Sequence, residues 1–307
     1  MHLQIVKNRN KFFIFSGTLM ILSIISLCVW GLKPSIDFTG GALMEVRIYG
    51  ETKISAPELS EKLVKQNSAL GEIRVQPVGI DGYLLRTRHL SEAEHQTLLA
   101  NIATSAGVEK NQVQENRFES IGPVIGGELR VKAFWAIALA SLFIILYIAY
   151  AFRKVSKPVA SWKYGLGAVI AVLHDLLIVT GCFSVFGHFF GFEVDLLFVS
   201  ALLTVLGFSV HDTIVVYDRT RENLIYNPQK TFEDTVNKAT NDTMTRSINT
   251  SLTVFIVLLA LYVLGGASIS NFVLALLIGV VFGTYSSIFV ASTLLVVWYQ
   301  LGRRGSK

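Results

Sequence analysis

The sequence predicts a polytopic α-helical membrane protein that carries one additional α+β domain. Of its 307 residues, 52% are hydrophobic and only 16% are charged, whereas soluble domains have about 25% charged residues. The stretch from Phe12 to Leu32 contains no charge, and a helix of that length spans about 30 Å, the thickness of a bilayer core. Further apolar runs predict six transmembrane helices in all, near residues 12–32, 133–152, 164–187, 196–217, 247–264 and 271–299.

The first apolar run resembles either a signal peptide or a retained membrane anchor. Lys7, Arg9 and Lys11 precede it, as positive charges precede a signal peptide. The run is too long for a signal peptide, and no small-x-small cleavage site follows it. We therefore expect a retained anchor.

The positions of Lys and Arg predict the orientation in the membrane, because short cytoplasmic segments carry an excess of these residues. Four flanking segments are rich in them, whereas the opposite loops near 188–195 and 265–270 contain none. With six spans, all four lie on one side, which we expect to be cytoplasmic with both termini. The residues concerned are Lys7, Arg9 and Lys11; Arg153, Lys154, Lys157 and Lys163; Arg219, Arg221, Lys230 and Lys238; and Arg303, Arg304 and Lys307.

Four parts follow from this layout. Residues 1–32 form the cytoplasmic N-terminus and the first helix, and residues 33–130 form the extracytoplasmic domain. Residues 131–302 form a five-helix transmembrane bundle, and residues 303–307 form a cytoplasmic tail.

The outer segment has the pattern of a small α+β domain. Strands are predicted at 41–49, 72–78, 83–89 and 113–121, and helices at 55–67 and 91–106. Each helix opens with Ser-x-x-Glu, the pattern of a capping box. The order βαββαβ predicts a ferredoxin-like arrangement. Nothing in the domain resembles a catalytic constellation, which favours binding or mechanical work over chemistry.

Few ionisable side chains lie within the apolar runs, and such residues usually face the interior of a helix bundle. His174 and Asp175 lie in the third predicted span, and His211 and Asp212 lie in the fourth. Arg246 lies at the entrance to the fifth.

Asp212 and Arg246 are predicted at similar depth near the cytoplasmic face. Asp212 follows the start of its span at Leu196 by about 24 Å of helix, and Arg246 opens the next span from the inner side. A carboxylate and a guanidinium at that depth can pair between helices. We expect a polar helical face to point into the bundle or into a water-filled path; it consists of Arg246, Asn249, Thr250 and Thr253.

This pair has two interpretations. The structural one is an ion pair that fixes helix packing, or an arginine that reaches the interface. The functional one is a proton site, because burial favours the neutral acid and a nearby guanidinium favours the carboxylate. For His174 and Asp175, packing and proton relay stay open equally. The charged residues from Asp218 to Glu222 favour a solvated helix end, and Gly279-x-x-x-Gly283 indicates close helix packing.

Three stretches resemble a known family. Ser35-Ile36-Asp37-Phe38-Thr39-Gly40-Gly41 resembles the motif GIDFTGG after the first span. The stretch at 207–223, GFSVHDTIVVYDRTREN, resembles the family pattern G-[YF]-S-x-x-D-T-x-V-V-[FY]-D-R-x-R-E-N. Asp218 and Arg219 match the consecutive Asp and Arg of this pattern. TRSINTSLT at 245–253 resembles the start of the fifth span. Together with the layout, these features resemble the SecD/SecF family of protein-export membrane subunits, in the resistance–nodulation–division superfamily.

The resemblance implies a fold and an activity. The fold is half of a resistance–nodulation–division transporter. The activity is support of late protein export by the proton motive force, across the plasma membrane of a bacterium or archaeon. Implied partners are a SecD-like subunit, the SecYEG channel and a YajC-like subunit, with an exported polypeptide as substrate. The family's proton-coupling carboxylate falls on Asp212 and its arginine on Arg246. From their positions in the predicted spans, we add His211 and Asp175 as candidate proton-coupling residues.

Two positions depart from the family pattern. Ser35 stands where glycine is usual, and His211 stands where asparagine usually precedes the carboxylate. A histidine there either adds a group that titrates near neutral pH or replaces the hydrogen bond of the asparagine.

Two other functions were weighed. Half of a small-molecule exporter is one, although such exporters usually have about twelve spans in one chain. A membrane enzyme is the other, but no zinc motif, nucleophile elbow or phosphate loop occurs. We therefore expect no enzymatic activity, no metal site and no cofactor.

Overall fold

The computed structural model describes residues 3–49, 54–67, 70–79, 81–151, 159–227 and 229–304. The chain forms two compact units, residues 34–133 and the remainder, residues 1–33 with 134–307. Arg153, Lys154, Lys157 and Lys307, on which part of the predicted orientation rests, lie outside the described residues.

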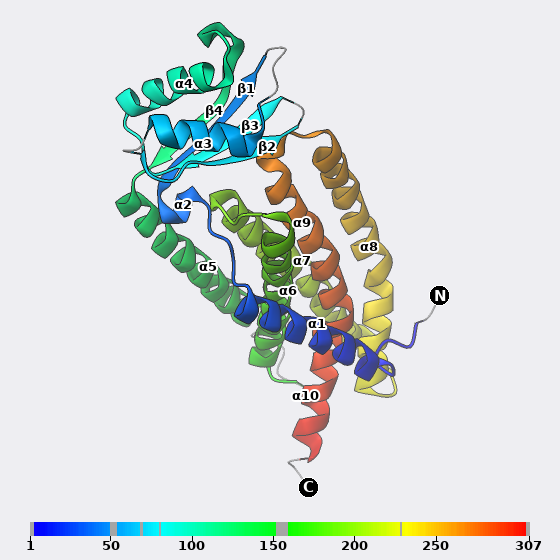
Figure 1. Cartoon of the computed structure of the whole chain (residues 1–307). Coiled ribbons are helices and arrows are strands. Elements are labelled where there is room, and N and C mark those ends of the chain that lie inside the picture. Colours follow the sequence, from blue (N-terminus) through cyan, green and yellow to red (C-terminus); the bar gives the residue numbers. More distant parts are fainter. Residues whose placement is uncertain are drawn as a thin grey trace. The chain divides into compact units, whose positions relative to one another are not determined.

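Within the described residues, the chain contains six helices that are long and apolar enough to cross a membrane, which confirms the predicted number (Figure 1). The last span contains three segments, because a π-helical stretch interrupts it. The helices are α1 (Arg9–Val29), α5 (Pro123–Ala151), α6 (Ser161–Phe190), α7 (Leu196–Tyr226), α8 (Phe232–Leu264) and the last span, α9 (Ala267–Tyr285), η3 (Ser286–Ala291) and α10 (Ser292–Arg304).

These six helices differ in burial. Half or more of the apolar window is buried in α6, α7 and the last span, whereas α1, α5 and α8 are mostly exposed. Exposed side chains on the outer helices are large and apolar, as at Leu22, Phe143 and Val257, and lipid tails accommodate them. The polar groups of the bundle are therefore concentrated around α7, which contacts α6, α8 and α9.

The fifth and sixth spans begin earlier than the apolar runs predicted. α8 begins at Phe232 instead of near residue 247, and the last span begins at Ala267 instead of Asn271. The apolar run marks only the part of a helix that suits lipid, and a polar stretch extends α8. Its N-cap is Thr231, whose hydroxyl accepts a hydrogen bond from Asp234 N at 3.1 Å.

Helices α7 and α9 approach closely at the predicted small-residue pair. A Cβ atom on Gly279 would lie 2.1 Å from Val205 Cγ2, and one on Gly283 would lie 3.2 Å from Ser209 Cβ. A side chain at Gly279 would therefore require Val205 or α7 to move, and one at Gly283 would require Ser209 to shift by a few tenths of an ångström.

The smaller unit has the predicted βαββαβ order and a four-stranded antiparallel sheet in the order β2-β3-β1-β4. Split βαβ units with this order are ferredoxin-like, as predicted. Helices α3 and α4 cover one face of the sheet (Figure 1), where Leu59 and Leu98 pack against Met44, Val46 and Leu85. The elements are α2 (Ile36–Thr39), β1 (Gly41–Ile48), α3 (Ala56–Gln66), β2 (Arg74–Val78), β3 (Gly82–Thr87), α4 (Glu92–Ala106), η2 (Lys110–Gln112) and β4 (Val113–Ile121).

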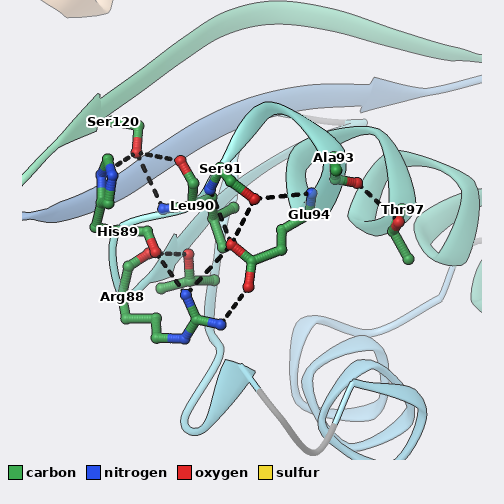
Figure 2. Close-up of polar contacts among 9 residues, drawn as sticks. Arg88, His89, Leu90, Ser91, Ala93, Glu94, Thr97 and Ser120 are labelled. Carbon is green, nitrogen blue, oxygen red and sulfur yellow. Dashed lines mark hydrogen bonds and ion pairs between the residues drawn. The ribbon is translucent and has the colours of Figure 1, made fainter.

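A complete capping box starts α4, as predicted. Figure 2 shows Ser91 Oγ accepting from Glu94 N at 3.4 Å, while Ser91 N donates to Glu94 Oε2 at 2.8 Å. Arg88 forms an ion pair with the same carboxylate. At α3 the structure has the Ser55 bond of the predicted box, and the Glu58 carboxylate pairs with Lys62 at 3.0 Å.

Substitution of Gly279 by alanine tests the helix contact. Gly279→Ala should lower the free energy of unfolding by about 1–3 kcal/mol, because the new methyl group overlaps Val205. Thermal unfolding in detergent measures this. The matched control is Gly207→Ala on α7, where a Cβ atom meets nothing within 4 Å. Equal losses in the two variants would contradict the packing described.

The charge of Glu94 gives the outer unit a defined pH dependence. The Arg88 guanidinium and hydrogen bonds from Ser91 lower the pKa of Glu94 to about 2. A lowered folded-state pKa stabilises the fold above the unfolded value of about 4.3, and this stabilisation is lost as pH falls towards 2. Glu94→Gln should therefore lower the melting temperature at neutral pH but not at about pH 2. If the melting temperatures of wild type and Glu94→Gln differ by the same amount at both pH values, the charge of Glu94 does not cause the difference.

Candidate functional site

Helix α7 carries a buried hydroxyl face that sequence analysis missed. Ser209, Thr213, Tyr217 and Thr220 are each fully buried. Their spacing of four, four and three residues places them on one side of a helix, so the periodicity was a usable signal. Around this helix the structure brings together two separate polar groups, one at Asp212 and one at Asp175.

Asp212 is buried against α8 with its hydrogen bonding incomplete. The residue is 4% exposed, and Ser247 of α8 lies near its carboxylate. Yet within the described part of the chain, Asp212 Oδ2 and Ser247 Oγ both lack a hydrogen-bond partner. A buried charged group without its partners is costly. This site therefore favours the arrival of a proton or of a further donor.

His211 flanks the carboxylate from the exposed side. Its side chain is 64% exposed, and its Nδ1 lies 3.9 Å from Asp212 Oδ1. When it is protonated, this histidine places a positive charge beside Asp212. His211 is thus exposed, whereas the neighbouring Asp212 is buried.

Arg246 is close to Asp212 but does not pair with it. Arg246 precedes Ser247 on α8, and it is exposed. Among the described residues, no guanidinium nitrogen of Arg246 lies within the 4 Å of an Asp212 carboxylate oxygen that an ion pair requires. Successive residues point about 100° apart on a helix, so a helix that presents Ser247 to Asp212 turns Arg246 aside. The guanidinium still acts on the Asp212 carboxylate through its charge.

The polar face of α8 does not point into the bundle of this chain, which leaves the water-filled path as its predicted environment. Arg246, Asn249, Thr250 and Thr253 are all exposed. The buried face of α8 instead carries small hydroxyl residues, which permit close helix approach; these are Thr240, Thr243, Ser247 and Ser251.

Asp175 of α6 is fully buried and fully hydrogen-bonded. His174 Nδ1 lies 2.8 Å from Asp175 Oδ1, and Oδ2 accepts from Ser209 Oγ at 2.6 Å and from Ser286 Oγ at 2.7 Å. These donors come from α6, α7 and η3. The far nitrogen of the ring, His174 Nε2, is buried without a partner within the residues that the structure describes.

The motif after the first span is a tight turn within the outer unit. Ser35 Oγ caps α2 by accepting from Asp37 N at 3.2 Å, so the serine takes a helix-capping role. Gly40 and Gly41 have φ angles of 73° and 135°, and a Cβ atom on Gly40 would lie 2.7 Å from Pro123 Cα. The turn explains both glycines. Phe38 and Thr39 complete α2, where Thr39 Oγ1 donates to Ser35 O.

Asp218 and Arg219 lie at the exposed end of α7, apart from Asp212. Arg219 pairs with Glu222 at 2.8 Å and with Asp242 of α8 at 3.0 Å, and Asp218 pairs with Arg221 at 3.6 Å. This part of the motif joins α7 to α8. No cluster of three or more metal-ligating side chains occurs among the residues that the structure covers.

Comparison with known proteins identifies the family. Residues 101–301 match the family described as "Protein export membrane protein SecD/SecF, C-terminal". The chain is 44% identical to "Protein translocase subunit SecF" of Thermobaculum terrenum, over 96% of this chain and 94% of that protein. It is 37% identical to the subunit of the same name from Sebaldella termitidis, over 96% and 91%.

Solved structures agree with this match. The crystal structure of SecDF from Thermus thermophilus, described as a translocon-associated membrane protein, has a TM-score of 0.82 at 30% identity. The match covers 98% of this chain and 39% of that one. SecDF in its super-membrane-facing form has a TM-score of 0.69 at 30% identity, covering 100% and 40%. This chain therefore spans about two-fifths of the solved SecDF chains.

The two carboxylates should respond differently to neutralisation. Asp175→Asn should lower the free energy of unfolding by about 1–3 kcal/mol, because it weakens three hydrogen bonds to a charged group. Asp212→Asn should lower the free energy of unfolding by less, because within the described residues Asp212 Oδ2 has no hydrogen bond to lose. Thermal unfolding in detergent at neutral pH compares them. A larger loss for Asp212→Asn would show that its carboxylate is satisfied in the folded protein.

Proposed function

Because the chain belongs to the SecD/SecF family of protein-export membrane proteins, we propose that it is a SecF-like auxiliary subunit of the Sec protein translocase. In this role it uses the proton motive force to promote late steps of protein export across the plasma membrane. The names of the relatives support the translocase role. The geometry around Asp212 supports the use of protons.

The observation that carries the proton mechanism is the incomplete bonding of Asp212. Protonation of Asp212 removes a buried charge and supplies a donor, which Ser247 Oγ on α8 is placed to accept. Deprotonation restores attraction to Arg246. Each proton that crosses a membrane potential of 100 mV supplies about 2.3 kcal/mol. Helices α7 and α8 meet at Asp212, so we expect this energy to move these two helices relative to each other.

A SecD-like partner fits the polar face of α8. Exposed groups at membrane depth need a protein or water environment, and Arg246 heads a row of them that this chain leaves uncovered. The match covers only 39% and 40% of the two solved SecDF chains, so more than half of each has no counterpart in this chain. We place the equivalent partner surface against this face of α8, where it encloses Asp212 and Arg246 together.

The proposed orientation follows from charge and layout, whereas the proposed substrate and further partners follow from the family. Both termini are cytoplasmic, and residues 33–130 lie outside the membrane, because Lys and Arg cluster on the other side. The outer domain holds the emerging polypeptide and resists its return. The SecYEG channel and a YajC-like subunit complete the complex.

Gradient-driven export tests this function. Inverted membrane vesicles containing the chain and its partner import an exported protein with or without an imposed proton gradient. Asp212→Asn should abolish the gradient-dependent part of import while the complex still assembles. The gradient-independent part should stay at the wild-type level, because the channel itself is unchanged.

Glu222→Gln is the matched control for this experiment. Glu222 is an exposed carboxylate on the same helix, and Arg219 keeps its second partner, Asp242, when Glu222 is neutralised. The control should retain gradient-dependent import. If Asp212→Asn also retains it, Asp212 has a structural role and the proposed proton mechanism is wrong.

A further inference from the structure

A second carboxylate in the same bundle occupies a built site that the Asp212 mechanism does not use. Asp175 is 0% exposed and receives donors from three segments of the chain, through His174, Ser209 and Ser286. We call these four residues the Asp175 cluster. Ionisable groups inside membrane helices are costly and rarely lack a function.

The hydrogen-bond pattern is that of an ionised carboxylate. An ionised carboxylate only accepts hydrogen bonds, and each of the three neighbours has a proton to donate. Two of them, the hydroxyls of Ser209 and Ser286, meet on the same oxygen, Oδ2, at 2.6 and 2.7 Å. If a proton occupied Oδ2, one hydroxyl would have to become the acceptor instead.

The structure offers Ser286 a second acceptor for that case. Ser286 Oγ also lies 3.1 Å from the backbone oxygen of Gly283, on the preceding turn. When Oδ2 carries a proton, that proton is donated to Ser286 Oγ, and the Ser286 hydroxyl proton is donated to Gly283 O. The bond between Asp175 and Ser286 therefore reverses its direction and loses the charge of the carboxylate, which weakens it, while the hydroxyl gains a bond within its own helix.

Ser286 begins the π-helical turn of the last span. Residues 286–291 form this turn, and Ser287 within it donates to Ser209 O at 3.1 Å and bonds Thr213 Oγ1 at 2.8 Å. π-Helical turns are strained insertions that occur often at functional sites. Here the turn is attached to α6 through Asp175 and to α7 through Ser287.

We propose that Asp175 is a second proton-binding carboxylate of this chain, and that it clamps the π-helical turn through Ser286 when ionised and holds it less tightly when protonated. The role in transport rests on the proposed function, in which protons drive helix movement. The protonation itself does not, because it follows from the contacts of this cluster alone.

The surroundings restrict which groups affect this carboxylate. Its titratable neighbours are His174 on its own helix and, beyond the imidazole, Tyr285 on α9 with ring centroids 6.4 Å apart. Helix α7 and the π-helical turn present only hydroxyls to it, because Asp212 lies against α8.

Infrared titration of the purified full chain tests the protonation. The carbonyl stretch of a protonated carboxylic acid is separate from that of a carboxylate, and Asp175→Asn should remove one pH-dependent acid band. Ser286→Ala should keep this band but move it to a higher pH, by roughly one to two units, because one donor to the ionised form is lost. Ser184→Ala is the matched control, since this buried serine of α6 donates to Ser26 O of α1 and has no part in the Asp175 cluster.

The clamp has its own readout. Backbone hydrogen exchange of segment 283–291 should be faster in Asp175→Asn than in wild type or Ser184→Ala. If Asp175→Asn removes no pH-dependent band, Asp175 does not exchange protons and the proposal fails. If the Asp175 band is present, but Ser286→Ala does not shift it and Asp175→Asn does not change the hydrogen exchange of segment 283–291, then Asp175 does not clamp the π-helical turn. Neither result bears on the Asp212 export test, so the two failures are distinguishable.

Discussion

The close approach of α7 to the last span is the contact on which the bundle depends. Gly279 and Gly283 leave little room for side chains between the helices, so the backbones meet and the hydroxyls of Ser209, Thr213 and Ser287 come within hydrogen-bond distance. A wider separation would leave these hydroxyls, and with them Asp175, without partners inside lipid. The polar interior and the tight packing are therefore one feature, because each requires the other.

The two buried carboxylates differ in what surrounds them. Asp175 lies at the centre with three donors, while Asp212 faces α8 with one oxygen unsatisfied in the described structure. A satisfied charge holds elements together, whereas an unsatisfied one makes its helix sensitive to any proton or partner that arrives. The polar face of α8 beside Asp212, exposed in this chain, gives that partner a place to bind.

Much of this architecture is readable in the sequence, for identifiable reasons. Six apolar runs predicted six helices, and period-two strands with Ser-x-x-Glu helix starts predicted the βαββαβ domain, because these signals are local. The face of α8 that is buried was not predicted, because polarity alone placed Arg246 inside, whereas packing selected the small residues Ser247 and Ser251. Ser286 was missed because hydroxyl residues such as Ser286 and Ser287 are common in membrane helices and carry no signal until the helices are placed. The turn at Gly40, which joins α2 to β1, was recognised as a motif, but the positive φ that requires glycine appears only in the fold.

In the proposed mechanism, Asp212 takes up and releases protons while a polypeptide is being moved. Proton flux into liposomes that contain this chain with its SecD-like partner measures this, recorded with and without an unfolded polypeptide on the side of the outer domain. We expect a flux that depends on the polypeptide in wild type and is lost in Asp212→Asn. An equal, polypeptide-dependent flux in the variant would contradict it, because protons would then pass without using this carboxylate.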